Sequence, residues 1–103
     1  MKADIERIAR EILKEIGDNI SAKNIERGSE IEVMAGFVNE DYFISIGIEK
    51  EGAGVNLCRR ENLGRDFDYV LKVLERVRDG LVYEKYRAPI ILKYIKDQDK
   101  QRL

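Results

Sequence analysis

Three stretches in the middle of the chain alternate apolar and polar residues. Residues 31–37 and 42–48 have a period of two, the repeat of a half-buried β-strand. A shorter run at 55–59 follows the glycine-containing break at 50–54, and the break at 39–41 has the length and composition of a tight hairpin. The pattern predicts a three-stranded antiparallel meander. Its inner face consists of Ile31, Val33, Phe37, Ile44, Ile46, Ile48, Val55 and Leu57.

Two stretches with a helical repeat flank this predicted sheet. The stripe of the first helix consists of Ile5, Ile8, Ala9, Ile12, Leu13 and Ile16, and Gly17 suits its C-terminal end. The stripe of the second helix runs over 67–77. Asn62 or Asp66 suits its N-cap, and Gly80 suits its end. A sheet with one apolar face is not stable alone, so we expect both helices to pack on that face.

The segment after the second helix has a less regular pattern. Residues 81–88 fit either a short helix or an extended connector, and both alternatives stay open. Pro89 suits the first turn of a new helix, and residues 90–95 are apolar over much of a helical circumference. We therefore expect a C-terminal helix that frays into a tail at 96–103. The predicted fold class is α+β, in the order helix, three-stranded antiparallel meander, helix and C-terminal helix, within a single domain of residues 1–103.

The order helix, three-stranded meander, helix over residues 2–79 resembles that of the double-stranded RNA-binding domain. The resemblance concerns topology. At the start of the second helix, where that family is lysine-rich, residues 64–68 read Gly-Arg-Asp-Phe-Asp. At the first hairpin, where that family carries a histidine, residues 39–41 read Asn-Glu-Asp. The resemblance therefore implies an order of elements and does not extend to the residues with which the family binds RNA.

Composition and charge narrow the class of protein. The chain has 19 basic and 20 acidic residues, so its formal net charge is -1 and no global field directs it to nucleic acid or to an anionic membrane. No apolar run is long enough for a membrane span, and the charged N-terminus does not resemble a signal peptide. We therefore expect a cytoplasmic protein without a membrane partner. Abundant Glu and Lys with few Cys and Gln is typical of heat-adapted proteins.

The residue types that usually carry enzyme chemistry are scarce. The chain has no His, the usual general base and metal ligand. Its one cysteine, Cys58, is expected on the outer or partly covered side of the third strand. The glycines of 52–54 link two strands rather than open a helix, so they favour a turn over a nucleotide site. We predict that the protein is not an enzyme and that it uses no cofactor and no metal.

The outer side of the predicted sheet is the first candidate binding surface. It carries Met34, Val38 and Phe43 among small residues and is short of charge, as association surfaces often are. Ile91, on the predicted last helix, is the fourth candidate interface residue. Either that helix covers the outer side and completes the core, or the outer side binds a second copy in a symmetric homodimer. The leading hypothesis is a small protein-interaction module whose partner is itself or another protein.

A basic loop is the second candidate surface. Arg59, Arg60 and Arg65 surround the connection into the second helix, where they can meet phosphates beside the first amides of that helix. Glu61 and the acids at the helix start are interleaved with them, so solvated or ion-paired arginines are the competing interpretation. The alternative hypothesis is a nucleic-acid-binding domain that uses residues 59–65.

Overall fold

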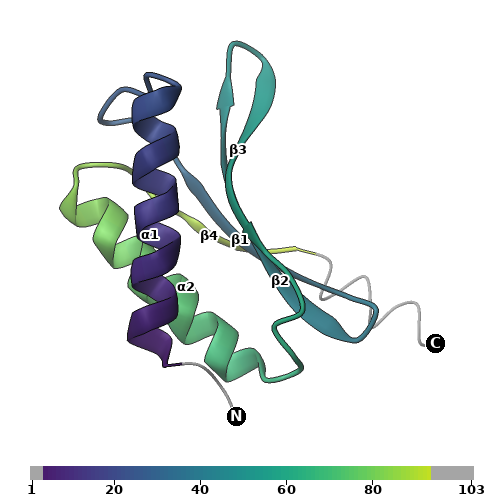
Figure 1. Ribbon diagram of the computed structural model, residues 1–103. Helices are drawn as coiled ribbons and strands as arrows, with labels where there is room; N and C mark the ends of the chain where they lie inside the picture. The colour runs from purple at the N-terminus through teal and green to yellow at the C-terminus, as the bar shows by residue number, and fades with distance from the viewer. Residues whose placement is uncertain (1–3, 94–103) are drawn as a thin grey trace.

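The computed structural model describes residues 4–93 and shows an α+β fold of two helices and a four-stranded mixed sheet (Figure 1). The elements follow in the order α1 (Ile5–Ala22), β1 (Glu32–Val38), β2 (Asp41–Lys50), β3 (Ala53–Arg60), α2 (Phe67–Tyr83) and β4 (Ile90–Leu92). The strand order is β3-β2-β1-β4, with β1 to β3 antiparallel and β4 parallel to β1. Both helices lie on the same side of the sheet, which confirms the predicted meander and its helical cover (Figure 1).

The core fills the space between the helices and the sheet. The residues of the predicted inner face that are buried are Ile31, Val33, Ile44, Ile46, Ile48 and Leu57, while Phe37 and Val55 pack at its margin. Both helices begin at acidic N-caps. Asp4 accepts a hydrogen bond from the Glu6 N–H at 2.9 Å, and Asp66 accepts one from the Tyr69 N–H at 3.1 Å. Asp66 is therefore the N-cap of α2, one of the two predicted from the sequence.

Both helices continue past the glycines that were expected to end them. Gly17 and Gly80 each lie within a helix. A Cβ atom on Gly80 would lie 2.6 Å from the Leu13 Cδ1 atom, so this glycine allows α1 and α2 to approach closely. Residues 81–88, which the sequence left open, comprise the last turn of α2 followed by a connector into β4.

The predicted C-terminal helix is wrong in the part that the structure describes. Ile90–Leu92 form β4 instead, and the remainder of that predicted helix and the tail at 96–103 lie outside the described residues. Pro89 disfavours helical geometry at Ala88, and adjacent isoleucines favour extended backbone. The free edge of β1 then offers hydrogen bonds to this extended segment. The Val33 N–H, for example, donates to the Pro89 carbonyl oxygen at 3.0 Å.

Two-residue turns close both hairpins. The φ angles are 51° and 65° at Asn39 and Glu40, and 54° and 81° at Glu51 and Gly52. Positive φ at both central residues is typical of a type I′ turn, whose twist matches that of the flanking strands. The turns are shorter than the breaks in the alternating pattern, so β2 already begins at Asp41.

A β-bulge in β3 changes which side of the sheet the following residues face. The register with β2 shifts at Leu57, and the side chains of Leu57 and Cys58 are both fully buried. Cys58 therefore lies in the core, and its expected position on the outer or partly covered side was wrong. Beyond the bulge, Arg60 contacts α1 and Arg59 lies on the side of the sheet away from the helices. An analysis that assumes strict alternation along the strand cannot show that the residues after the bulge exchange sides of the sheet.

Candidate protein-interaction site

The side of the sheet away from the helices is here called the open face. It is defined by Glu32, Met34, Gly36, Phe43, Ser45, Gly47, Glu49, Arg59 and Ile91. Because side chains alternate along each strand, the registers decide which residues of the open face are neighbours. Its central row across the four strands consists of Ile91, Met34, Ser45 and Arg59. The central row is thus uncharged except for Arg59.

Phe43 lies between a glycine and an arginine on the open face. Its partner on β1 is Gly36, and a Cβ atom on Gly36 would lie 2.5 Å from the Phe43 ring. On the other side, the guanidinium carbon of Arg59 lies 4.4 Å from the ring centroid, a cation–π contact. The Phe43 side chain is only 6% exposed as a result. Phe43 therefore shapes the open face and offers little of its own surface to a partner.

The structure brings three of the four candidate interface residues together. Met34 and Ile91 are direct neighbours through the pairing of β1 with β4, and both are half-buried. Phe43 lies in the next row, whereas Val38 lies at the end of β1 and is 43% exposed. Ile91 reaches the open face as a strand residue, although the sequence placed it on a helix. Leu92, 46% exposed on the same strand, was not singled out from the sequence.

A hollow of about 320 Å³ lies beside the central row of the open face. The residues that line it include Met34, Ser45, Gly47, Val55 and Asn56, with Glu32 and Glu49 among the others. Gly47 leaves the floor of the hollow without a side chain. A Cβ atom there would lie 2.8 Å from the Val55 carbonyl oxygen, so a larger residue does not fit without a shift. The sequence shows Gly47 but does not show the hollow, because the hollow depends on the bulge in β3 and on how closely β3 lies against β2.

Charge on the open face is sorted along the direction of the strands. Glu32 and Glu49 lie at the end that carries the hollow, and both are exposed. Arg59 lies nearer the opposite end, with its guanidinium group over the Phe43 row, and Lys93 follows β4 in that direction. The end with Glu32 and Glu49 is therefore mainly acidic, although Arg87 lies beside them, and toward the other end the Arg59 guanidinium group has Glu61 at 3.6 Å.

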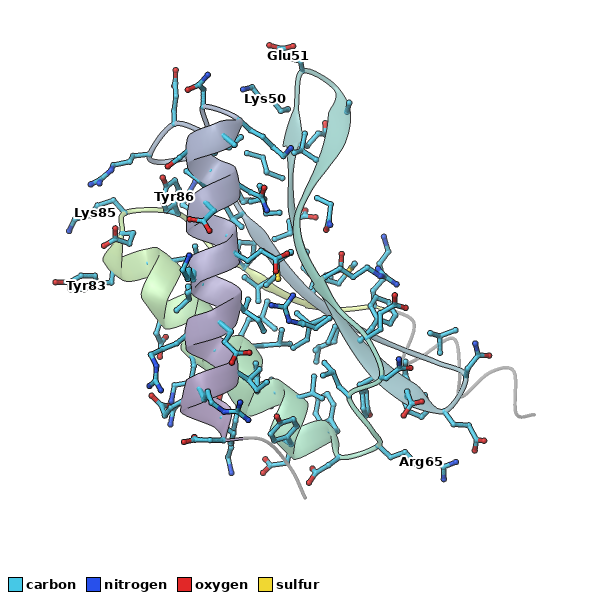
Figure 2. The ribbon with its side chains drawn as sticks, viewed as in Figure 1. Lys50, Glu51, Arg65, Tyr83, Lys85 and Tyr86 are labelled. Atoms are coloured by element: carbon cyan, nitrogen blue, oxygen red, sulfur yellow. The ribbon has the colours of Figure 1, made fainter. Side chains whose placement is uncertain are left out.

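The three arginines of the nucleic-acid hypothesis do not form one cluster. Arg59 lies on the open face 3.6 Å from Glu61, and Arg60 is turned toward α1. Arg65 pairs with Glu40 in the first hairpin and lies at the lower edge of the view in Figure 2. Each of the three guanidinium groups has a carboxylate partner, and they face different directions. Nucleic-acid binding through these residues stays a prediction, and this geometry favours it less than the sequence did.

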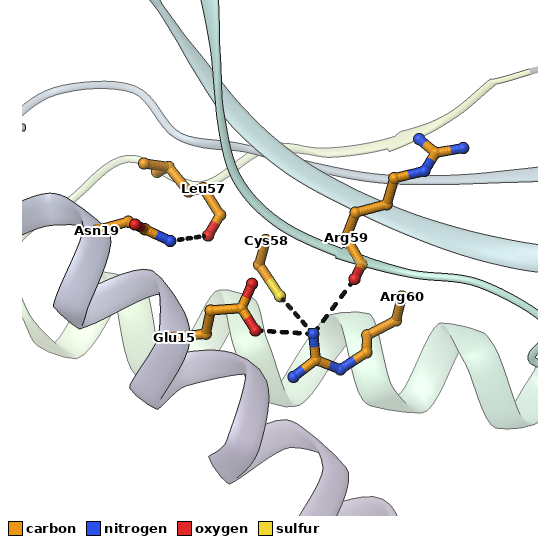
Figure 3. A network of polar contacts seen from close by, with 6 residues as sticks. All are labelled: Glu15, Asn19, Leu57, Cys58, Arg59 and Arg60. Atoms are coloured by element: carbon orange, nitrogen blue, oxygen red, sulfur yellow. Dashed lines mark hydrogen bonds and ion pairs between the residues drawn. The ribbon is translucent and has the colours of Figure 1, made fainter.

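Arg60 belongs to a polar network between β3 and α1 (Figure 3). Its Nη1 atom donates to Glu15 Oε1 at 2.8 Å and to Cys58 Sγ at 3.4 Å, and the Asn19 amide donates to the Leu57 carbonyl oxygen at 2.7 Å. The hydrogen bond from Arg60 to Glu15 raises the pKa of the guanidinium group. Burial raises the pKa of the Cys58 thiol to about 11, so this thiol is protonated at neutral pH. The network fixes α1 on the bulged strand.

The described part of the chain shows neither a metal-binding cluster nor a membrane-spanning helix. Within residues 4–93, no three side chains of His, Cys, Asp or Glu are grouped so that they could hold a metal ion. Over the same residues, neither helix combines the length and the apolar character that crossing a bilayer requires. Comparison of the chain with protein-family models, characterised proteins and solved structures gave no match.

Proposed function

We propose that the protein is a small interaction module that binds a second copy of itself through the open face. The observation that carries this proposal is the uncharged middle of the open face, where Met34, Ser45 and Ile91 are neighbours and are only half-buried. When two copies stack face to face with their strands running in opposite directions, Glu32 and Glu49 of each copy lie toward Arg59 of the other. Such a contact is self-complementary, as a two-fold interface must be. Stacking with the strands in the same direction would instead bring Glu32 and Glu49 of both copies together.

The shape of the open face supports the same arrangement. In the antiparallel stack the central rows of the two copies face each other, so Met34 and Ile91 lose their remaining contact with water. The row that contains Gly47 then faces the row of the second copy that contains Phe43 and the overlying Arg59. The surface beside Gly47, which has no side chain there, then receives the Phe43 ring and the Arg59 side chain of the second copy. Two stacked sheets need this complementarity of shape.

Two further observations support a binding role rather than a catalytic one. The chain contains no His, and its only thiol is fully buried with a raised pKa. The thiolate is the reactive form of cysteine, so Cys58 is poorly suited to act as a nucleophile. We therefore infer a non-enzymatic module and assign the working surface to the open face.

Light scattering behind a sizing column, over a range of protein concentrations, tests this proposal. The chain has a mass of 12.0 kDa, and we expect a species of twice that mass. Ile91→Glu places a charge in the central row and is expected to give a folded monomer. The matched control is Val82→Glu, which alters an apolar residue that is 53% exposed on α2 and should leave the dimer intact. A monomeric wild type, or a dimer that both variants retain, would overturn the proposal.

A further inference from the structure

A second hollow, of about 330 Å³, lies between α1 and the C-terminal end of α2 and is here called the interhelical hollow. Its aliphatic lining comes from both helices and consists of Leu13, Ile16, Ile20 and Leu81. Gly17 also lines it, and a Cβ atom on this glycine would meet nothing within 4 Å. Pockets for small molecules span about 300–1,000 Å³ and are mostly apolar, so the interhelical hollow has the size and lining of a site for a small ligand.

Two side chains of opposite charge, Arg27 and Glu84, line the interhelical hollow together with Ser21 and Tyr86. Arg27 and Glu84 do not pair with each other. Within residues 4–93, neither side chain makes a hydrogen bond or an ion pair with any other residue. Among the arginines of that part of the chain, Arg10 is the only other one without a carboxylate partner. The hollow therefore has one cation and one anion at its margin, and both are available to a ligand.

The loop after α1 and the connector after α2, which carry these two charges, are tied together through their backbones. The Gly28 N–H donates to the Lys85 carbonyl oxygen at 3.0 Å, and the Arg87 N–H donates to the Ser29 carbonyl oxygen at 3.1 Å. Ile25 anchors the loop, because its side chain is buried in the core. The backbone around the hollow is therefore fixed before a ligand binds, which lowers the entropic cost of binding.

The C-terminal end of α2 adds to the negative charge of Glu84. This residue is the C-cap of the helix, and the last turn before it contains no basic residue. The carbonyl groups at the end of a helix favour a cation and disfavour an anion. A positively charged group of a ligand would therefore be attracted both by the Glu84 carboxylate and by the end of α2. Arg27, on the loop after α1, would attract a negatively charged group instead.

These features together select a small zwitterion with an apolar side chain. The Arg27 guanidinium group can donate two parallel hydrogen bonds to a carboxylate, and the Glu84 carboxylate can accept hydrogen bonds from an ammonium group. The aliphatic lining between the helices suits a hydrocarbon group. A ligand with a single charge would leave one of the two charged side chains without a counter-charge, and an uncharged apolar group would use neither of them.

We propose that the interhelical hollow binds a free α-amino acid with an aliphatic side chain of about the size of leucine. The carboxylate of the amino acid pairs with Arg27, its ammonium group pairs with Glu84, and its side chain lies against the aliphatic residues of the two helices. None of the residues that line this hollow belongs to the open face. The proposed dimer and the proposed ligand site can therefore fail separately.

Titration of the full-length protein with three matched ligands, followed by amide NMR, tests this proposal. The probe is L-leucine, and the controls are isocaproate, which lacks the ammonium group, and isoamylamine, which lacks the carboxylate. Leucine is expected to give saturable shifts at the amides of Gly17, Ser21 and Leu81. Its dissociation constant should be at least about tenfold lower than that of either control, because each control loses one charge-assisted contact.

Variants of the two charged residues assign each end of the ligand. Arg27→Gln should weaken binding of leucine by about tenfold and leave isoamylamine unaffected, whereas Glu84→Gln should weaken leucine equally and leave isocaproate unaffected. Lys85→Gln is the matched control, since Lys85 is exposed, does not line the hollow and lies farther from α1 than Tyr86 in Figure 2.

Gly17→Leu fills the hollow from an open position on α1 and should abolish binding of leucine while the fold persists. Absence of saturable shifts with leucine, equal binding of leucine and its two analogues, or shifts confined to residues outside the hollow would overturn the proposal.

Discussion

Arg59 stacks over the ring of Phe43, with its guanidinium carbon 4.4 Å from the ring centroid. The contact exists because the bulge at Leu57 turns Arg59 toward the open face and Arg60 toward α1. It places a cation at one end of a surface whose other end carries Glu32 and Glu49. The proposed dimer depends on this position of Arg59, and therefore on a single irregularity in β3.

The centre of the inner face tolerates no charge. Ile46 is fully buried in the middle of β2, so Ile46→Asp would bury an unpaired carboxylate and cost about 4 kcal/mol or more. Thermal unfolding followed by circular dichroism should show no cooperative transition for this variant. The neighbouring Ser45→Asp substitution lies on the open face and should keep a cooperative transition. An unchanged melting curve for Ile46→Asp would mean that the faces of the sheet are assigned the wrong way round.

The two glycines inside the helices should respond differently to alanine. Gly17 has no atom within 4 Å of a Cβ position, so Gly17→Ala should raise the free energy of unfolding by about 0.5–1 kcal/mol through helix propensity alone. Gly80→Ala gains the same propensity but must displace Leu13, whose Cδ1 atom would lie 2.6 Å away. Urea unfolding should therefore rank Gly17→Ala above Gly80→Ala. Equal stabilisation by both would contradict the close approach of the helices at Gly80.

Stability should fall at alkaline pH because of Cys58. Burial raises the pKa of this thiol from 9.0 to about 11 in the folded protein. Above the lower value the unfolded chain releases a proton that the folded chain still holds, so the free energy of unfolding decreases as pH rises from about 9 to 11. The expected loss is about 1 kcal/mol between pH 8 and about pH 10.

Cys58→Ala provides the control for this pH dependence, because tyrosine and lysine side chains also titrate in that range. The urea unfolding free energy of the variant should decline less steeply between pH 8 and about pH 10 than that of the wild type. Parallel curves for the two proteins would show that the thiol is not held protonated by the fold.

The sequence was sufficient for the parts of the fold that depend on local periodicity. The stripe from Ile5 to Ile16 and the alternation around Ile44 and Ile46 correctly predicted a helix, a meander and the face that the helices cover. Periodicity could not predict β4. Its three strand residues fit an apolar helix equally well. They form a strand because the edge of β1 offers backbone hydrogen bonds to an extended segment.

The candidate site was predictable only in part. Met34 and Phe43 were placed on the correct side by alternation, and their neighbours follow from the registers. The positions of Cys58 and Arg59 were not predictable, because a bulge adds a residue without leaving a distinct signal in the sequence. The hollow beside Gly47 and the hydrogen bond from the Asn19 amide to the Leu57 carbonyl oxygen depend on contacts between segments distant in the sequence.

The most direct test of the central claim is a charge-reversal cycle on the open face. The dimer dissociation constant would be measured by sedimentation equilibrium for Glu32→Lys, for Arg59→Glu and for the double variant. Each single reversal places like charges opposite each other across the interface and should weaken the dimer by about tenfold. The double variant restores opposite charges and should recover most of the affinity. Additive losses in the double variant, or no effect of either reversal, would contradict antiparallel stacking of the open faces.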